Sequence, residues 1–507
     1  MRRLPALVMF AVGVGLATWP MLSSGLELME CDPGDTRLLN YVLEHGYRWL
    51  LGRAELFSPP FFWPERGVGP FTELMVGTLP LYAPWRLLGF EPDTSFQLWM
   101  FAVLSLNFVA AHALFARALK LEPVPAAAGA FIIAFGSSRM AQLNHQHLLP
   151  VFFAVLAVHA LVRIFEGGPR AWVPVFFFGA VAQLWASVTL GWLFGFWLLV
   201  LLGWSLALRV PRAAVLHVVR ERRAPLLMSG AVAAVLLVPL AVGYGGAGPR
   251  DFEGVRAMVP QLQSWLYQGP YSVLYAPLAE LSVFTQLPSE GEHRIGVGLF
   301  TTLVMVVMLR KEPWLRALGL TALTVVALST LYRGRVSPWV GVMHVLPGAD
   351  GIRAVGRVGL FMLFPAAVSV ALLAKRARPA GLVVVALCLL EQLQRVPDVY
   401  SKGKVRSDVA AVTAAVPSTC RAFFYAPRGG DGWHEKTQLD AMWAALWSGV
   451  PTVNGYSGHF PPGWEPLFPH ALNGPEDEVR VREALAKWAQ SRGVAEKDVC
   501  WVEVGSR

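Results

Sequence analysis

Charged residues are scarce in this chain. They make up 15% of its 507 residues, whereas hydrophobic residues make up 55%. Soluble globular domains carry about 25% charged residues, so this chain has too little charge to cover a water-exposed surface along its whole length. The scarcity argues against an ordinary soluble protein and predicts that lipid surrounds most of the chain.

The sequence also lacks the glycine-rich loops that cradle phosphates. Neither G-x-x-x-x-G-K-[ST] nor a strand-bounded G-x-G-x-x-G occurs. We therefore expect no nucleotide cofactor, which argues against an ATP-driven pump and against a transferase of cytosolic nucleotide sugars. The net charge of +9 does not indicate nucleic acid as a partner, because the Lys and Arg residues lie mainly in short linkers between apolar runs.

Long apolar runs are abundant. A helix that crosses about 30 Å of hydrocarbon needs roughly 20 apolar residues, and we place about eleven such spans. They lie at 4–22, 97–118, 123–140, 147–166, 172–187, 190–208, 225–244, 294–310, 315–331, 357–374 and 379–395. A polar break at Ser187, Thr189 and Gly191 divides 171–209 into two of them. The predicted fold class is a mainly α, polytopic transmembrane helical bundle.

The basic residues of the linkers give this bundle an orientation. Lys and Arg accumulate in cytoplasmic linkers, and here every second linker is basic. The basic groups are Arg2 and Arg3, Arg117 and Lys120, Arg163 and Arg170, the arginines of 209–223, those of 310–316 with Lys311, and those of 375–378 with Lys375. The alternation predicts an N-terminus inside and a C-terminus outside, with a first span that resembles a signal peptide but stays uncleaved.

The composition of the sequence becomes more polar after residue 395. Residues 1–395 are the predicted transmembrane module, with a large first external loop at 23–96, whereas 396–507 are more polar. Strand-like pieces at 421–425 and 500–504 with helix-like pieces between them predict a small soluble α/β domain. Cys420 and Cys500 lie in the two strand candidates on the oxidising side, so they form either a disulfide or two buried thiols.

Two carboxylates flank a turn at the start of the first external loop. The chain reads Asp32-Pro33-Gly34-Asp35, where Pro-Gly favours a turn before a helix. Asp32 and Asp35 can point to one spot and hold a divalent cation, Mg²⁺ or Mn²⁺, or one of them can act as a general base. The alternative is that Asp35 is the N-cap of the helix and the turn is only a solvated acidic turn.

A polar cluster joins the third and fourth spans on the external side. It contains Asn144, His145 and His147, shortly after Arg139. Ionisable groups next to hydrocarbon usually serve a site or a pathway. We favour polar contacts to a substrate over metal ligation, because two His residues two positions apart do not share a helix face.

A second cluster places arginines outside, against the positive-inside trend. Arg353 and Arg357 follow Asp350 and directly precede the tenth span. Such arginines need an anionic partner. A phosphate is one candidate, because a guanidinium binds phosphate oxygens bidentately; Asp350 and the first-loop carboxylates are the other.

Together these motifs resemble the bacterial branch of the GT-C superfamily, polytopic glycosyltransferases that take sugar from a polyprenyl-phosphate carrier. The motifs are Asp32-Pro-Gly-Asp35, Phe135-Gly-Ser-Ser-Arg139 with Asn144-His-Gln-His147, Pro347-Gly-Ala-Asp-Gly-Ile-Arg353-Ala-Val-Gly-Arg357, and Asn454-Gly-Tyr-Ser-Gly458 with Pro461-Pro-Gly-Trp464. The last motif is either a tight turn or part of an acceptor groove.

The resemblance implies a transferase of the bacterial inner membrane with a periplasmic C-terminal domain and a glycan, lipid or protein acceptor. It implies Asp35, or secondly Asp32, as the general base, with a divalent cation nearby. It implies that Arg353 and Arg357, with Arg139, hold the donor phosphate. Many relatives carry an adjacent acidic pair, whereas Pro-Gly separates the two residues here, so the identity of the base and the metal stay open.

Two rival hypotheses remain. The chain could be a transporter or flippase for a lipid-linked glycan, or a non-catalytic relative that binds without reacting. Transporters often consist of two similar halves. We find no clear internal repeat in this sequence, which favours the enzyme.

Overall fold

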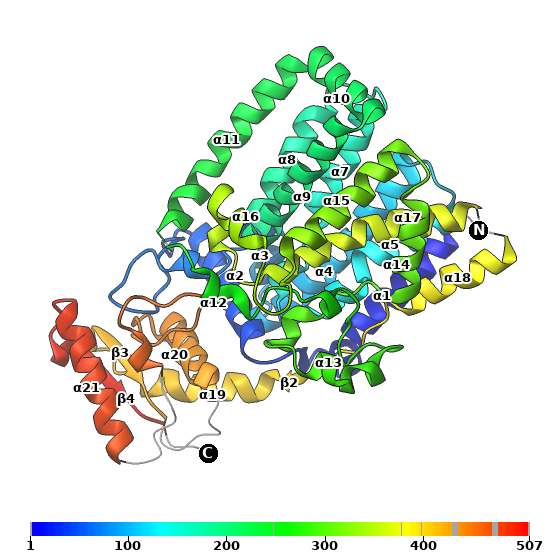
Figure 1. The fold of residues 1–507 in the computed structure, drawn as a ribbon. Coiled ribbons are helices and arrows are strands. Elements are labelled where there is room, and N and C mark those ends of the chain that lie inside the picture. Colours follow the sequence, from blue (N-terminus) through cyan, green and yellow to red (C-terminus); the bar gives the residue numbers. More distant parts are fainter. Residues whose placement is uncertain are drawn as a thin grey trace. The chain divides into compact units, whose positions relative to one another are not determined.

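A computed structural model describes residues 3–246, 248–376, 378–396, 398–427, 434–468 and 475–504 of the chain. Helices dominate it (Figure 1). The chain divides into two compact units. We call Met1–Ser23, Leu98–Pro239 and Gly248–Pro397 the membrane unit, and Ser24–Gln97, Leu240–Ala247 and Asp398–Arg507 the loop–tail unit.

A helix occupies each of the segments predicted to span the membrane. These helices are α1 (Leu4–Ser23), α4 (Pro92–Ala113), α5 (Pro123–Phe135), α7 (Phe152–Phe165), α8 (Trp172–Ala186), α9 (Val188–Ala207), α11 (Arg223–Gly245), α14 (Leu299–Met308), α15 (Pro313–Ser329), α17 (Leu363–Arg376) and α18 (Pro379–Leu390). Among the described residues, six helical segments are long and apolar enough to cross a membrane, and further apolar helices are shorter. The chain is therefore a polytopic helical membrane protein, and the count of eleven crossings stays a prediction.

Short helices connect these segments. They are α6 (Ser137–Met140), η4 (Gln146–Leu148), α10 (Arg209–Glu221), α12 (Phe252–Arg256), η5 (Leu262–Trp265), η6 (Ala276–Glu280), α13 (Ser282–Thr285), η7 (Glu290–His293), α16 (Trp339–Val345), η8 (Ala349–Gly351), η9 (Val355–Met362) and η3 (Leu114–Ala118), a π-helical end of α4. The polar break near residue 187 separates α8 from α9, and Ser187 Oγ accepts the N–H of Leu190 as an N-cap.

The core of the membrane unit forms around α5. Its middle reads Ala126-Ala-Ala-Gly-Ala130, and every residue of this stretch is buried. Small side chains let neighbouring helices approach closely, and α5 packs against both α1 and α17. At the contact with α1, a Cβ at Gly13 would lie 2.2 Å from the ring of Phe135. Close packing therefore depends on small residues, as expected for helices in lipid.

The loop–tail unit combines short strands with amphipathic helices. Its elements are β1 (Leu28–Glu30), α2 (Asp35–Leu50), η1 (Gly69–Phe71), η2 (Val76–Thr78), α3 (Leu79–Leu87), β2 (Val399–Ser401), α19 (Lys402–Ala415), β3 (Ala422–Tyr425), α20 (His434–Ser448), η10 (Glu465–Leu467), α21 (Pro475–Ser491), η11 (Glu496–Asp498) and β4 (Val499–Val502). Strands β3 and β4 pair in parallel, and a disulfide joins Cys420 to Cys500 beside them. Phe423 of β3 and Val502 of β4 belong to the hydrophobic core.

The first loop and the C-terminal residues fold together in this unit. Strand β1 pairs antiparallel with β2. The backbone of 60–63 also pairs with that of 452–454, since the N–H of Phe62 donates to Asn454 O at 3.0 Å and that of Trp63 to Thr452 O at 2.9 Å. The predicted division at residue 395 assigned the first loop to the transmembrane module. The structure differs because these hydrogen bonds join segments that lie far apart in the sequence.

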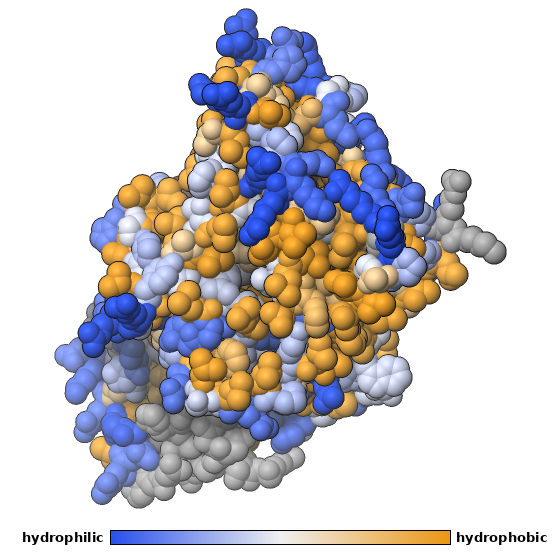
Figure 2. Space-filling model, turned by 45° about the vertical axis from the view of Figure 1, so that its right-hand side comes forward, coloured by the Kyte–Doolittle hydropathy of each residue, from blue (hydrophilic) through white to orange (hydrophobic). Residues whose placement is uncertain are grey.

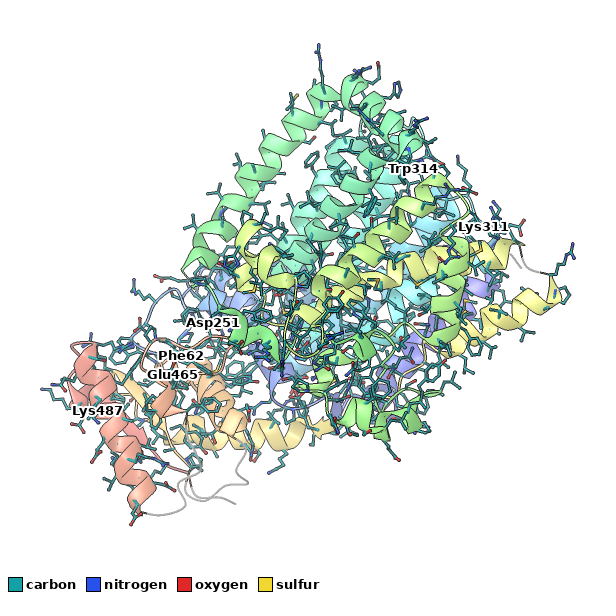
Figure 3. All side chains as sticks on the ribbon, viewed as in Figure 1. Phe62, Asp251, Lys311, Trp314, Glu465 and Lys487 are labelled. Atoms are coloured by element: carbon teal, nitrogen blue, oxygen red, sulfur yellow. A yellow bond between two sulfur atoms is a disulfide. The ribbon has the colours of Figure 1, made fainter. Side chains whose placement is uncertain are left out.

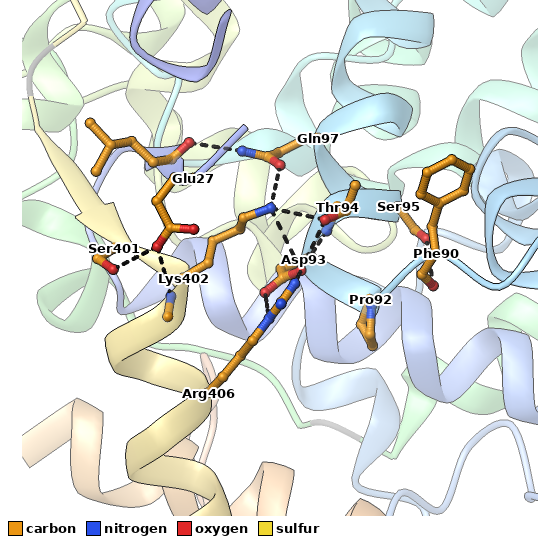
Figure 4. Close-up of polar contacts among 12 residues, drawn as sticks. Glu27, Phe90, Pro92, Asp93, Thr94, Ser95, Gln97, Ser401, Lys402 and Arg406 are labelled. Atoms are coloured by element: carbon orange, nitrogen blue, oxygen red, sulfur yellow. Dashed lines mark hydrogen bonds and ion pairs between the residues drawn. The ribbon is translucent and has the colours of Figure 1, made fainter. Parts of the chain in front are cut away.

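A polar network fastens α19 inside the same unit (Figure 4). Lys402 Nζ donates to Thr94 Oγ1 and to Gln97 Oε1, each at 2.9 Å. One turn later, Arg406 Nε donates to Asp93 Oδ2 at 2.7 Å. Lys402 is buried, and these partners satisfy its ammonium group. The network thus fixes the start of α19 against the first residues of α4.

Candidate functional site

The acid turn at Asp32 and Asp35 starts α2. Asp35 is the first residue of the helix, and Gly34 occupies the N-cap position without a side chain. The carboxylate of Asp32 does the capping, because its Oδ1 accepts the N–H of Gly34 at 2.8 Å and that of Asp35 at 3.1 Å. The hypothesis that Asp35 is the N-cap is therefore wrong. The Pro-Gly turn folds Asp32 back over the helix N-terminus and leaves Asp35 on its first turn.

Asp35 has a specific partner in the loop–tail unit. Tyr456 donates its hydroxyl hydrogen to Asp35 Oδ1, with the two oxygens 2.9 Å apart. Both side chains are half-buried. Burial, together with the negative charge and hydrogen bond of Asp35, raises the pKa of Tyr456. The phenol therefore stays protonated and continues to donate to the carboxylate.

The segment that carries Tyr456 is held rigidly from both sides. Asn454 is buried, its Oδ1 accepts the N–H of Tyr425 at 2.7 Å, and its Nδ2 donates to Tyr425 O at 3.0 Å. A Cβ at Gly455 would lie 2.1 Å from the ring of Phe62, so only glycine fits. Phe62 (Figure 3) packs in turn on Trp464, with ring centroids 4.8 Å apart. The Asn454–Gly458 motif is thus more than a surface turn, because it orients Tyr456 toward Asp35.

A buried ion pair holds α2 against α20. Arg37 Nη2 lies 2.6 Å from Asp440 Oδ1, and both side chains are almost fully buried. Burial raises the pKa of Asp440 even though Arg37 opposes the shift. One turn along α2, Tyr41 packs edge-on against Trp443 with ring centroids 5.6 Å apart. These contacts set the position of the helix whose first residue is Asp35.

The acid turn offers the oxygen ligands that a hard cation needs. Mg²⁺ and Mn²⁺ are commonly bound by one or two carboxylates, with water and phosphate completing the coordination. Within the described ranges, no three His, Cys, Asp or Glu side chains gather closely enough to hold a metal ion. Asp32 and Asp35 would supply two carboxylate ligands, and metal binding there stays a prediction.

A second polar site lies in the membrane unit, around Glu292 of η7. Arg357 donates two hydrogen bonds to this carboxylate, from Nη2 to Oε1 at 2.7 Å and from Nε to Oε2 at 3.1 Å. Arg357 Nη1 also donates to His147 Nε2 at 3.1 Å, and His145 Nε2 lies 3.7 Å from Glu292 Oε1. We call Glu292, Arg357, His145 and His147 the arginine cluster. It brings together two motifs that the sequence analysis treated separately.

Electrostatics keep Glu292 ionised. Burial alone would raise the pKa of this carboxyl, but the charges of Arg357, His145 and Arg353 and the hydrogen bonds of Arg357 lower it to about 2. Arg353 is exposed. Burial and the like charge of Arg353 lower the pKa of Arg250 to about 10. The guanidinium groups of Arg357 and Arg353 thus both act on one carboxylate, and guanidinium groups also bind phosphate oxygens.

Arg139 and Asn144, the other predicted substrate ligands of this segment, lie just before and at the end of a short turn that precedes His145. Arg139 is 1% exposed, and its guanidinium donates to Ile133 O at 3.0 Å and to Leu148 O at 2.9 Å. It therefore positions the backbone next to His147. Asn144 is half-buried in the turn just before His145.

Glu292 was not among the site residues predicted from the sequence. The sequence did contain an indication of a polar site there, because Glu290-Gly-Glu292-His293-Arg294 is a charged run at the start of a predicted span. Its partner is 65 positions away, so the pair could not be recognised locally. Gly356 allows the approach, because a Cβ there would lie 2.2 Å from the backbone oxygen of Glu292.

No family model matches the chain, and no curated protein matches it. Among solved structures, the chain matches the single-particle cryo-EM structure of arabinofuranosyltransferase AftD from Mycobacteria with a TM-score of 0.51 at 14% identity. The chain shares that fold. The match covers 91% of this chain and 32% of that chain. A likeness at this low identity shows the fold alone and assigns neither a family nor a substrate.

Proposed function

We propose that the chain is a membrane glycosyltransferase that moves a sugar from a polyprenyl-phosphate donor to an extracytoplasmic acceptor. The observation that carries the proposal is the likeness of fold to an arabinofuranosyltransferase over 91% of the chain. The sugar is a pentose or a hexose, and the acceptor is a glycan, a lipid or a protein. In this proposal the chain lies in the bacterial inner membrane with its N-terminus inside and its C-terminal residues in the periplasm.

Asp35 acts as the general base in this reaction. Its carboxylate, oriented by the hydroxyl of Tyr456, takes the proton from an acceptor hydroxyl. The acceptor oxygen then bonds to the anomeric carbon of the donor sugar, and the bond from that carbon to the phosphate oxygen breaks. The lipid phosphate leaves with the electron pair. Because this leaving group is already activated, the reaction needs no nucleotide.

The arginine cluster and Arg353 together bind the donor phosphate in the same proposal. Arg353 and Arg357 offer guanidinium groups to its oxygens and stabilise the charge that develops on them. His145, His147 and Asn144 provide polar contacts. The carboxylates of Asp32 and Asp35 would hold the predicted divalent cation.

The test is transfer of labelled sugar from polyprenyl phosphate by the purified full-length protein. We expect Asp35→Asn to lower the rate by about 10²–10⁴-fold, the usual contribution of general base catalysis. Asp477→Asn is the matched control, because Asp477 forms a partly exposed ion pair with Arg480 on α21, and ion pairs near the surface contribute little. Undiminished transfer by Asp35→Asn would exclude Asp35 as the base.

A second variant tests the phosphate site separately. Arg353 is exposed, so Arg353→Gln removes a charge and leaves the pair of Glu292 with Arg357 in place. We expect KM for the donor to rise about tenfold with a smaller change in kcat, as for loss of a charged hydrogen bond. Movement of a lipid-linked glycan across vesicles by the wild-type protein, without any transfer product, would instead support the transporter.

A further inference from the structure

Helix α10 (Arg209–Glu221) connects α9 to α11 in the membrane unit (Figure 1). It packs against α7, α9 and α15, and Pro211 and Val215 are its buried residues. Immediately after it, Arg222 donates to Gly168 O at 2.6 Å and to Pro169 O at 3.3 Å. These contacts fix one side of the helix to the bundle.

The other side of α10 is basic. Arg209, Arg212 and Arg220 are exposed, and at 100° per residue they fall within an arc of about 80°. Leu216 lies between them on this arc and is 40% exposed. Exposed Arg223 follows as the first residue of α11. Over residues 209–223 the sequence holds five arginines and one glutamate, so this face carries a clear excess of positive charge.

The flanking helices locate this face at the edge of the hydrocarbon. Helix α9 exposes Leu199, Leu202 and Leu206 as it approaches α10. Helix α11 exposes Leu227 and Met228 directly after Arg223, and only 6% of its most apolar 18-residue stretch is buried. Both helices are apolar enough to be surrounded by acyl chains, so the helix between them lies where acyl chains give way to headgroups.

The surface of the membrane unit shows the same change from apolar to polar residues toward α10. Figure 2 shows hydrophilic side chains gathered at the top of the view, the end at which Figure 1 labels α10, above a broad hydrophobic surface. Arginines at such a boundary extend their guanidinium groups toward phosphate while their methylene stems lie along apolar neighbours.

We propose that α10 is a binding surface for the headgroups of anionic phospholipids, of which phosphatidylglycerol is one. Arg209, Arg212, Arg220 and Arg223 contact the headgroup phosphates, and Leu216 inserts among the acyl chains. Charge complementarity selects this partner, because a zwitterionic headgroup offers no net charge to four guanidinium groups. An exposed leucine on the basic arc favours a lipid over a soluble polyanion. The inference is independent of sugar transfer.

The test titrates the full-length protein, in micelles of a zwitterionic detergent, with phosphatidylglycerol or with phosphatidylcholine, and counts bound lipids by native mass spectrometry. We expect Arg212→Gln/Arg220→Gln to bind phosphatidylglycerol about 25-fold more weakly, roughly fivefold for each guanidinium lost. Binding of phosphatidylcholine should not change. Arg212→Lys/Arg220→Lys keeps the charge and should bind within about threefold of wild type.

Arg53→Gln/Arg66→Gln is the matched control, because it removes two exposed arginines from the loop–tail unit. An equal loss of phosphatidylglycerol in this variant would overturn the proposal, as would wild-type affinity in Arg212→Gln/Arg220→Gln. Loss of a co-purifying protein without any loss of lipid would likewise overturn it, in favour of a protein interface. An unchanged melting temperature in lipid-free micelles shows that the substituted α10 is folded.

Discussion

Tyr456 donates a hydrogen bond to Asp35 across 2.9 Å, although 421 positions separate the two residues. Asp35 begins α2 in the first loop, and Tyr456 follows the buried Asn454 near the C-terminus. This bond gives the proposed base a defined orientation. Neither the Asp32-Pro-Gly-Asp35 motif nor the Asn454–Gly458 motif contains that information alone.

Replacing Tyr456 with Phe tests the orienting role. The variant keeps the aromatic ring and removes only the donor to Asp35. A hydrogen bond to a charged group contributes about 1.5–3 kcal/mol, so we expect kcat for sugar transfer to fall roughly tenfold or more. Tyr425→Phe is the control, because the backbone of Tyr425, not its hydroxyl, binds Asn454. An unchanged kcat for Tyr456→Phe would contradict an orienting hydrogen bond.

Two substitutions of Asp32 separate capping from metal binding. Asn keeps an oxygen that can accept the N–H groups of Gly34 and Asp35, whereas Ala does not. We expect Asp32→Ala to lower the free energy of unfolding by about 1 kcal/mol and Asp32→Asn by only about 0.3 kcal/mol. If a cation is held at the acid turn, Asp32→Asn should raise the Mg²⁺ or Mn²⁺ concentration for half-maximal transfer. Transfer that resists chelators in the wild type would remove the metal from the mechanism.

Acid should weaken the membrane unit through Glu292. Its pKa lies near 2 in the folded protein, below the ordinary value of 4.5. A carboxyl whose pKa is lowered by folding stabilises the protein above its unfolded pKa, and this contribution is lost as pH falls through the folded value. We therefore expect up to about 3 kcal/mol of stability to disappear between about pH 5 and about pH 2. Unfolding by denaturant at a series of pH values measures the loss.

Glu292→Gln provides the comparison for that measurement. The amide cannot titrate, so the part of the pH dependence that belongs to Glu292 should be absent in the variant, although its stability at neutral pH is lower. Parallel curves for the variant and the wild type would mean that another group causes the acid sensitivity.

Gly356→Ala should distort the arginine cluster. The added Cβ would lie 2.2 Å from the backbone oxygen of Glu292, and backbone there can move little. Overpacking of this kind costs about 1–3 kcal/mol, so we expect a lower melting temperature and a higher KM for the donor. Gly351→Ala is the matched control in the same segment, since nothing lies within 4 Å of its added Cβ. Equal effects of the two substitutions would show that Gly356 has no special role.

Several features of the fold could be predicted locally. The span segments are identified by the transfer of apolar side chains into lipid, which depends on each segment's own composition. The break between α8 and α9 is marked by Ser187, whose hydroxyl caps the following helix. The site was only partly predictable. His147 and Arg357 were singled out as polar residues next to predicted spans, whereas Glu292, which joins them, was not.

Other features depend on pairing between distant segments. The capping role belongs to Asp32 instead of Asp35 because the turn folds its carboxylate over two N–H groups. The first loop folds with the C-terminal residues because Phe62 pairs with Asn454 through the backbone and Arg37 with Asp440 through a buried ion pair. Composition contains no information about such partners.

Hydropathy alone identifies this chain as a polytopic helical membrane protein, because the transfer of each side chain into lipid depends on that residue itself. Asp35, Arg353 and Arg357 could also be identified from the sequence as candidates, because charges near lipid are costly and usually serve a site. The hydrogen bond from Tyr456 to Asp35 and the ion pair of Glu292 with Arg357 could be recognised only in the folded chain. Hydrogen bonds and ion pairs are short-range and directional, so they depend on the folded positions of residues that the sequence keeps far apart.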